Sequence, residues 1–365
     1  MAHFNGRELF VPSNDVFWFR LDKKLVASFD EANFVDFNWD DYVKYDEGLE
    51  IKLKAKNVSY EMNGEKDFKE YSEIPARFVH SKGDAIALSP AGWRPIAFIP
   101  NGAIVLFDKN AFGTIKNHID KKGNPQPNAI NVVVDFFQNR KITIDPKPIL
   151  LEGNNRFDRR LPSLEEMRTE LGFFTTKMQE RAPNLTIKAT DDSLPLLHRA
   201  SALFFQGLEA ILEFIDAVYK KYESSHKIPQ SLEGFKAILD LAKTANVQGV
   251  HLIFAAIVFK AVTGEKHNPI LKLLKFNKPN FIKEGHSFNG ALDIYSLILF
   301  LSEIRNHGDN VFFVTADKDL IHLWNDMNAF MMVNDEPGVL HFDMMYFLPG
   351  LEESDVDELQ ELMRV

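Results

Sequence analysis

The chain has 365 residues, of which 45% are hydrophobic and 12% aromatic, a composition typical of a folded globular protein rather than a disordered one. It contains no cysteine, so disulfides, thiolate metal sites and cysteine nucleophiles are excluded. The formal net charge of −10 argues against a protein that coats nucleic acid non-specifically, but it is compatible with a nuclease whose metal-binding acids add negative charge.

No stretch of the sequence approaches the ~20 consecutive apolar residues that a membrane-spanning helix needs. The nearest, HLIFAAIVFKAVTG (251–264), is interrupted by Lys260, and the N-terminal MAHFNGRELF lacks the apolar run of a signal peptide. We therefore expect a soluble, cytoplasmic protein that does not enter a membrane.

The first 99 residues have the pattern of short strands separated by turns. Apolar and polar residues alternate with a period of two in several segments, as in strands with one buried face. We therefore predict a β-rich or α+β N-terminal module over residues 1–99. The expected strands are DVFWFRL (15–21), KLVASF (24–29), LEIKLKAKNVSYEM (49–62), ARFVHS (76–81) and DAIALS (84–89).

The pattern changes near residue 100. PNGAIVLFDKN (100–110) predicts a turn and then a strand, and its continuous apolar run is typical of parallel strands covered on both faces. Helices are expected near 111–119 and over NAINVVVDFFQN (128–139), with the loop KKGNPQPN (121–128) between them. KITIDPKPILLEGN (141–154) predicts a strand that leads into a helix.

Residues 162–277 are expected to be mostly helical, because apolar residues recur there at three- and four-residue spacing. The last block returns to alternating helices and strands, which indicates βαβ units and a parallel sheet. The acidic residues 351–365 form a C-terminal tail. The expected helices are 163–182, 195–224, 231–245, 247–264, 291–308 and 317–327, and the expected late strands are VFFVTA (311–316) and VLHFDMMYFL (339–348).

Carboxylates occur at matching places in this pattern. Asp108 ends one predicted strand and Asp317 ends another, while Glu152 and Asp293 stand near the starts of predicted helices. In open α/β sheets, ligands bind beyond the carboxyl ends of the strands, so we expect these four acids to converge there. Like charges raise one another's pKa, and a divalent cation is the common compensation. Mg²⁺ prefers hard oxygen ligands, and a pair of such ions assists phosphodiester cleavage.

At these residues the chain resembles the PIN-domain family of nucleases. LFDKN (106–110) is similar to the opening motif of the family, an Asp at a strand end with an Asn two residues later. Glu152 and ALDIYSLILFLSEI (291–304), which contains Asp293, resemble its second and third acidic positions. VTADKDL (314–320) resembles the closing motif, with Thr315 two residues before the fourth acid, Asp317, and with Asp319 as an additional acid.

The resemblance implies an α/β fold with a Rossmann-like, PIN-like parallel sheet and cleavage of RNA, or less often DNA, with Mg²⁺ or Mn²⁺. Asp108, Glu152, Asp293 and Asp317 would hold the metal and Asp319 would assist. The nuclease domain would span 100–350, with its core in 100–155 and 287–348 and a helical insertion at about 156–286. The insertion and the N-terminal module would select the substrate or a protein partner.

Each acid also has a structural interpretation. Asp108 is an acceptable turn or helix N-cap residue, and Asp319 is another candidate cap. Asp293 in a first helical turn would complement the helix dipole. Asp145, before Pro146, competes with Glu152 for the second acidic position, although an Asp-Pro pair more often marks a turn.

Phosphate binding requires basic or polar groups near the acids. Arginines cluster in NNRFDRR (154–160) and lysines in LKLLKFNKPNFIK (271–283), where interleaved Phe276 and Phe281 are candidates for stacking on bases. Such lysines are more often the solvated face of a helix. The histidines lack zinc-site spacing. The candidate substrate-binding residues are Asn110, Thr315, Arg156, Arg159, Arg160, Lys275 and Lys278.

Two other functions stay open. A phosphatase of the haloacid-dehalogenase type also begins with an Asp at a strand end, but it normally has a second Asp where this chain has Asn110. The β-rich N-terminal module and the helical insertion would also suit a non-catalytic scaffold protein on a PIN-like fold. P-loop, dinucleotide-binding and GxSxG motifs are all absent from the sequence.

Overall fold

The computed structural model describes most of the chain beyond residue 99 and the strands before it. By contacts between Cα atoms the chain divides into two compact units. The sheet unit comprises residues 1–147, 172–189 and 306–316, and the helical unit comprises 148–171, 190–305 and 317–365. The described residues are 99–116, 141–153, 158–183, 185–222, 228–263 and 268–333, together with shorter stretches within 3–96 and 340–358.

An antiparallel sheet occupies the start of the sheet unit. It has seven strands in the order β1-β2-β3-β4-β6-β5, and β7 pairs with β6. The strands expected at 15–21, 24–29 and 49–62 are confirmed. The bounds are β1 (His3–Phe4), β2 (Arg7–Phe10), β3 (Phe17–Leu21), β4 (Leu25–Phe29), β5 (Glu31–Val35), β6 (Leu49–Met62) and β7 (Glu65–Phe78).

A second sheet has six strands in the order β12-β11-β10-β13-β8-β9. β12, β11, β10 and β13 are parallel, whereas β8 runs antiparallel to β13 and β9 antiparallel to β8. The protein is therefore α/β, with a mixed and mainly parallel sheet. The bounds are β8 (Ile86–Ser89), β9 (Gly92–Pro95), β10 (Ile104–Phe107), β11 (Thr143–Asp145), β12 (Thr186–Ile187) and β13 (Val311–Thr315).

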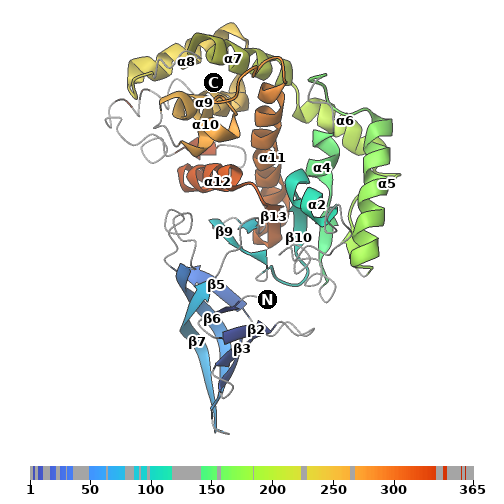
Figure 1. Ribbon diagram of the computed structural model, residues 1–365, viewed down its shortest axis with the longest axis vertical. Coiled ribbons are helices and arrows are strands. Elements are labelled where there is room, and N and C mark those ends of the chain that lie inside the picture. Colours follow the sequence, from blue (N-terminus) through green and yellow to red (C-terminus); the bar gives the residue numbers. More distant parts are fainter. Residues whose placement is uncertain are drawn as a thin grey trace. The chain divides into compact units, whose positions relative to one another are not determined.

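The two central strands are buried as their apolar sequences predict. Every residue of β13 is buried, and so are the last three residues of β10. The two strands lie side by side, with α2 (Lys109–Lys116) directly after β10 (Figure 1). On α2, Phe112 packs against Phe174 of α5 (Leu164–Arg181), with ring centroids 4.8 Å apart. This contact fixes α2, the helix that follows Asp108, against α5.

The two antiparallel strands of the mixed sheet come from the range predicted as the N-terminal module. β8 and β9 precede residue 100, yet β8 pairs with β13 through Phe313↔Leu88 and Thr315↔Ile86. The sheet therefore begins before the boundary that composition indicates. The reason is that β8 pairs with a strand more than 200 residues further along the chain, and the local pattern of apolar and polar residues does not reveal such a partner.

Residues 162–277 are mostly helical, as predicted, with the short strand β12 among the helices and one further correction. The single helix expected over 195–224 is two helices, separated at Phe205–Gly207, because Gly207 has a φ of +91° that a helix cannot contain. The bounds are α4 (Lys147–Glu152), α6 (Leu194–Phe204), α7 (Leu208–Tyr222), α8 (Leu232–Thr244), α9 (Ile253–Thr263), α10 (Pro269–Leu273), α11 (His286–His307) and α12 (Lys318–Phe330).

Aromatic side chains fill the core of the helical unit. Tyr295 of α11 is almost fully buried and packs against Phe205 and Phe254, with ring centroids 4.7 and 5.2 Å apart. Trp324 of α12 is fully buried against Phe300 of α11 at 4.7 Å. These contacts fix α11 and the middle of α12 within the unit. Figure 1 shows α12 beside α10 in this unit.

The last predicted strand has a different partner from the one expected. β15 (Leu340–Phe342) pairs with β14 (Met331–Val333) in a separate two-stranded sheet, not with the parallel sheet. The helix expected over 128–139 and the loop 121–128 lie outside the described residues. The same holds for most of the acidic tail, of which Glu358 pairs with Lys236 of α8 at 2.6 Å.

Candidate functional site

Asp108 stands at the carboxyl end of β10 and is held by the neighbouring strand. Its backbone N–H donates to the carbonyl oxygen of Val314 at 2.9 Å, and the hydroxyl of Thr315 donates to its Oδ2 at 2.8 Å. The register Phe107↔Val314 brings the next residues, Asp108 and Thr315, side by side. Asp108 is 5% exposed and Thr315 is fully buried, so this carboxylate has a fixed orientation.

Asp145 ends the adjacent strand β11 and is 1% exposed. Because it pairs in register with Leu106, it lies on the face of the sheet that Leu106 and Asp108 share. Its Oδ1 accepts from the backbone N–H of Lys147 at 3.1 Å, which confirms the turn expected of an Asp-Pro pair. The ammonium groups of Lys147 and Lys188 lie 3.4 and 3.3 Å from its Oδ2. Asp145 is thus a buried acid that two lysines neutralise.

In the helical unit, Asp317 and Asp319 stand at the start of α12. The Oδ1 of Asp317 accepts from the N–H groups of Asp319 and Leu320 at 2.9 and 3.2 Å, so Asp317 caps the helix. The sequence had offered Asp319 as the cap, and this assignment is wrong. Burial and, to a smaller extent, the negative charge of Asp317 together raise the pKa of Asp319 to about 6.

Lys272 lies near this pair of acids. It belongs to α10, which packs against α12, and its positive charge lowers the pKa of Asp319. The sequence placed Lys272 within a run of lysines but favoured its neighbours Lys275 and Lys278 as ligands. Lys278 is exposed, and its carbonyl oxygen accepts from the hydroxyl of Tyr219 at 3.2 Å. The position of Lys272 depends on helix packing, so no local pattern singled it out.

Glu152 and Asp293 have helix positions that differ from those predicted. Glu152 is the last residue of α4 and does not open a helix. Asp293 lies in the second turn of α11, not the first, because that helix begins at His286. Glu152 lines a small cavity of about 10 Å³ together with Leu292 and Tyr295 of α11, so the structure brings it close to the turn that carries Asp293. This volume holds no more than a water molecule.

The predicted phosphate ligands have varied positions. Asn110 is exposed on α2, and Arg156 lies outside the described residues. Both terminal nitrogens of the Arg160 guanidinium donate to the carboxylate of Glu166 at 2.8 Å, and that carboxylate also accepts from the Ser163 N–H at 2.7 Å. These contacts form a capping arrangement at the start of α5. Arg160 therefore has a structural role in this position.

Arg159 is engaged in a similar way. Its guanidinium donates to Oδ2 of Asp216 at 2.7 Å, and Asp216 is buried on α7. The half-buried Lys275 adopts a φ of +58° at a turn after α10. Among the residues with a described placement, no group of three or more histidine, aspartate or glutamate side chains is arranged to hold a metal ion.

Comparison with known proteins does not assign the chain to a family. No protein-family model matches the chain, and no curated protein or solved structure does so either. None of the helices in the described part of the chain is both long and apolar enough to cross a membrane.

Proposed function

We propose that the chain is a metal-dependent, PIN-like nuclease that hydrolyses phosphodiester bonds, of RNA more than of DNA. The proposal keeps Asp108, Glu152, Asp293 and Asp317 as metal ligands, with Asp319 assisting. The observation that carries it is the Thr315–Asp108 hydrogen bond of 2.8 Å at the carboxyl ends of two neighbouring parallel strands. Ligand sites of open α/β sheets lie at such ends, and a buried hydroxyl that orients an acid is typical support for a metal ligand.

The second support comes from the start of α12. Two carboxylates two residues apart, one of them with a pKa raised to about 6, form an acidic pair whose repulsion a bound cation would relieve. Lys272 offsets only part of this repulsion, because the pKa of Asp319 stays raised in its presence. The sequence links this pair directly to Thr315, which precedes Asp317 by two residues.

The donor set fits a hard cation. Mg²⁺ and Mn²⁺ take carboxylate oxygens and typically use only one or two of them, so they do not require a group of three acids. When bound, such an ion makes water a stronger nucleophile and stabilises the leaving oxygen. The residues of the chain would supply the rest: Thr315 orients the Asp108 carboxylate by its hydrogen bond, and Lys272, whose charge acts on Asp319, would attract a phosphate.

The test is incubation of labelled single- and double-stranded RNA and DNA with the protein, with and without Mn²⁺. We expect cleavage that requires Mn²⁺ and falls about 100-fold or more in Asp108→Asn and in Asp317→Asn. The matched control is Asp192→Asn, which neutralises an exposed acid far from these positions in the sequence. Cleavage that persists in both site variants would contradict the proposal.

The same proteins distinguish the alternatives. Mn²⁺ should raise the melting temperature of the wild type, and Asp317→Asn should remove the shift. Absence of both cleavage and a melting shift would favour a scaffold protein that binds partners through the N-terminal strands or the helical unit. Release of phosphate from a small phosphomonoester without nuclease activity would favour the phosphatase.

A further inference from the structure

The connection between α10 and α11 carries a local excess of positive charge. The whole chain has a net charge of −10, yet residues 271–283 contain four lysines and no acid. We call residues 272–283 the lysine turn. Three of its lysines are exposed and one is half-buried. A cluster of this sign on an acidic protein favours an anionic ligand. The lysines are Lys272, Lys275, Lys278 and Lys283.

Helix packing does not explain these lysines. Lysines at such a spacing are commonly the solvated face of an amphipathic helix. However, α10 ends at Leu273 and α11 begins at His286, so only Lys272 lies in a helix. The other lysines stand in the turns that join α10 to α11. A solvated helix face therefore accounts for one of the four.

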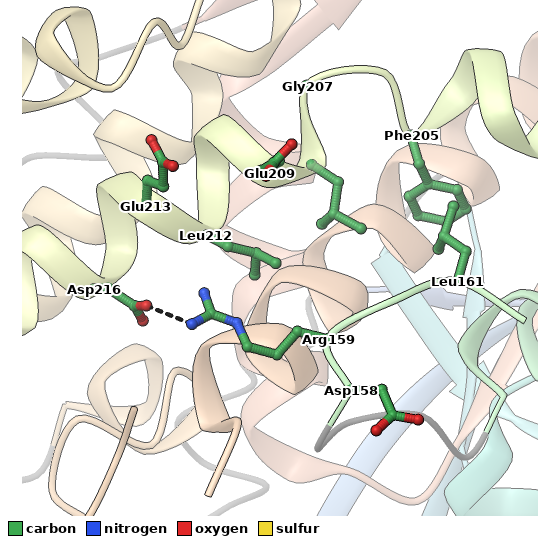
Figure 2. Close-up of a pocket in the computed structure, with 10 residues that line it drawn as sticks. Asp158, Arg159, Leu161, Phe205, Gly207, Glu209, Leu212, Glu213 and Asp216 are labelled. Atoms are coloured by element: carbon green, nitrogen blue, oxygen red, sulfur yellow. Dashed lines mark hydrogen bonds and ion pairs between the residues drawn. The ribbon is translucent and has the colours of Figure 1, made fainter. Parts of the chain in front are cut away.

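Neighbouring acids do not neutralise the lysine turn. Within the described part of the chain, none of its lysines forms an ion pair with a carboxylate. The arginines that the sequence suggested as phosphate ligands differ in this respect. Figure 2 shows Arg159 paired with Asp216, at 2.7 Å, in a cavity wall that contains further carboxylates. Arg160 pairs with Glu166. The lysine turn thus retains the charge that these arginines have already used.

Two aromatic residues and a series of backbone bonds hold the lysine turn in place. Phe281 is fully buried and stacks on Tyr219 of α7, with ring centroids 4.3 Å apart. The Tyr219 hydroxyl donates to the carbonyl oxygen of Lys278 at 3.2 Å. The N–H groups of Lys275 and Lys278 donate to the carbonyl oxygens three residues earlier, each at 2.9 Å. A turn that is already ordered loses little conformational entropy when a ligand binds.

The lysine turn begins beside the acidic pair of α12. Its first lysine belongs to α10, which packs against α12, and both helices are in the helical unit. The charges of Lys272 and Lys318 both act on Asp319. A polyanion bound along the lysine turn would therefore have one end near Asp317 and Asp319, the acids of the proposed nuclease site.

The aromatic residues of the lysine turn favour one kind of nucleic acid. Phe281 is fully buried, which excludes it as the base-stacking residue that the sequence suggested. Phe276 is only half-buried and lies between two of the lysines in the sequence. Unpaired bases stack on aromatic side chains, whereas a duplex covers its bases. Lysines contact the phosphates and do not read the base edges. The combination suits a single strand of any sequence.

We propose that the lysine turn binds the phosphodiester backbone of single-stranded nucleic acid and that Phe276 stacks on an unpaired base. The inference rests on the proposed function for the identity of the polyanion, because a nuclease needs a surface that holds its substrate beside the metal ligands. Binding to this surface requires no metal ion, so it can be measured while cleavage is prevented.

The experiment is fluorescence anisotropy of labelled single-stranded RNA and DNA of about 15 nucleotides. Each is titrated with the full-length protein in EDTA at several salt concentrations. We expect saturable binding whose log K falls with log salt at a slope of about −3, because each of four phosphate contacts contributes about −0.7. Lys278→Gln combined with Lys283→Gln should weaken binding about tenfold and flatten the slope by about 1.4. Both side chains are exposed, so the fold should stay intact.

Two further variants separate this surface from general charge attraction. Lys243→Gln combined with Arg199→Gln removes two exposed positive charges from α8 and α6, and it should bind like the wild type. Phe276→Leu should weaken the binding of single strands without weakening that of a duplex, with thermal melting as the check that the variant is folded.

Three outcomes would overturn the proposal. One is the absence of binding by both single strands at low salt. Another is equal weakening in the Lys243 and Arg199 control. The third is tighter binding of a duplex, or of phosphatidylserine vesicles, than of a single strand, which would assign the surface to another partner.

Failure of this proposal is distinguishable from failure of the proposed function. Binding that depends on the lysine turn without any Mn²⁺-dependent cleavage would support this surface and reject the nuclease. Mn²⁺-dependent cleavage with an unchanged KM in the variant of Lys278 and Lys283 would support the nuclease and reject this surface.

Discussion

The hydroxyl of Thr315 donates a hydrogen bond to Oδ2 of Asp108 over 2.8 Å, although 207 residues separate the two in the sequence. Both residues are buried, and the bond joins the carboxyl ends of β10 and β13. The orientation of one strand-end acid therefore depends on the residue that ends the neighbouring strand.

Replacing Thr315 with valine keeps the shape of the side chain and removes its hydroxyl. The buried Asp108 carboxylate then loses a donor, so we expect the free energy of unfolding in urea to fall by about 1–3 kcal/mol. Thr315→Ser retains the hydroxyl and should lie closer to the wild type. If the valine variant proved as stable as the wild type, the bond would have no energetic importance. Under the proposed function, the valine variant should also lose part of the Mn²⁺-dependent melting shift.

The raised pKa of Asp319 predicts how stability depends on pH. Its pKa is about 6 in the folded protein against an ordinary value of 3.8, so between these values the folded state binds more protons than the unfolded chain. The free energy of unfolding should therefore decrease as pH rises from about 4 to 6, by about 1 kcal/mol for this half-exposed group once solvent screening is allowed for. Urea unfolding across this range measures the decrease, and Asp319→Asn should reduce it.

Lys272 should influence the same titration. Its charge lowers the pKa of Asp319, so Lys272→Gln should move the midpoint of that carboxyl to higher pH. Carboxyl carbon shifts followed by NMR over a pH series report the midpoint directly. Lys275→Gln is the matched control, because Lys275 is not among the charges that shift this pKa, which are Asp317, Lys272 and Lys318. An identical midpoint in both variants would contradict the assigned contact.

Replacing two helical glycines with alanine should change the free energy of unfolding in opposite directions. A Cβ at Gly234 of α8 would overlap the carbonyl oxygen of Pro229 and lie 2.7 Å from Cγ2 of Ile228. Gly234→Ala should therefore lower the free energy of unfolding by about 1–3 kcal/mol. Gly172 of α5 has open space around the same position, so Gly172→Ala should raise it by about 0.5–1 kcal/mol. Chemical denaturation of both variants tests the pair, and destabilisation of similar size in the two would refute it.

Local sequence signals predicted much of the secondary structure. The apolar runs before Asp108 and Asp317 are β10 and β13, because both strands are covered on both faces. The helix expected at 231–245 is α8, and Ser231 caps it by accepting from the Gly234 N–H at 3.2 Å. Periodicity and caps act over a few residues, so they can be identified without knowledge of the fold.

Contacts between distant segments could not be predicted in this way. The arginine cluster after Glu152 suggested phosphate binding, but Arg159 pairs with Asp216, 57 residues further along the chain. Asp145 was expected to form a turn. Its ion pair with Lys188 could not be predicted from the sequence, because Lys188 follows a different strand. In both cases the partner is set by tertiary packing, which determines whether a charged group is available to a ligand.

The pairing of β13 with both β10 and β8 has a consequence for biosynthesis. While the chain emerges from the ribosome, β10 can gain β11 early, but its other edge and the β8–β9 hairpin wait for residues 311–315. A nascent chain therefore presents unpaired strand edges until residues 311–315 have been synthesised, and such edges favour aggregation or chaperone binding. Asp108, the buried acid that follows β10, acquires its hydrogen bond from Thr315 only after residue 315 has been synthesised, so the orientation of its carboxylate is fixed only from that point.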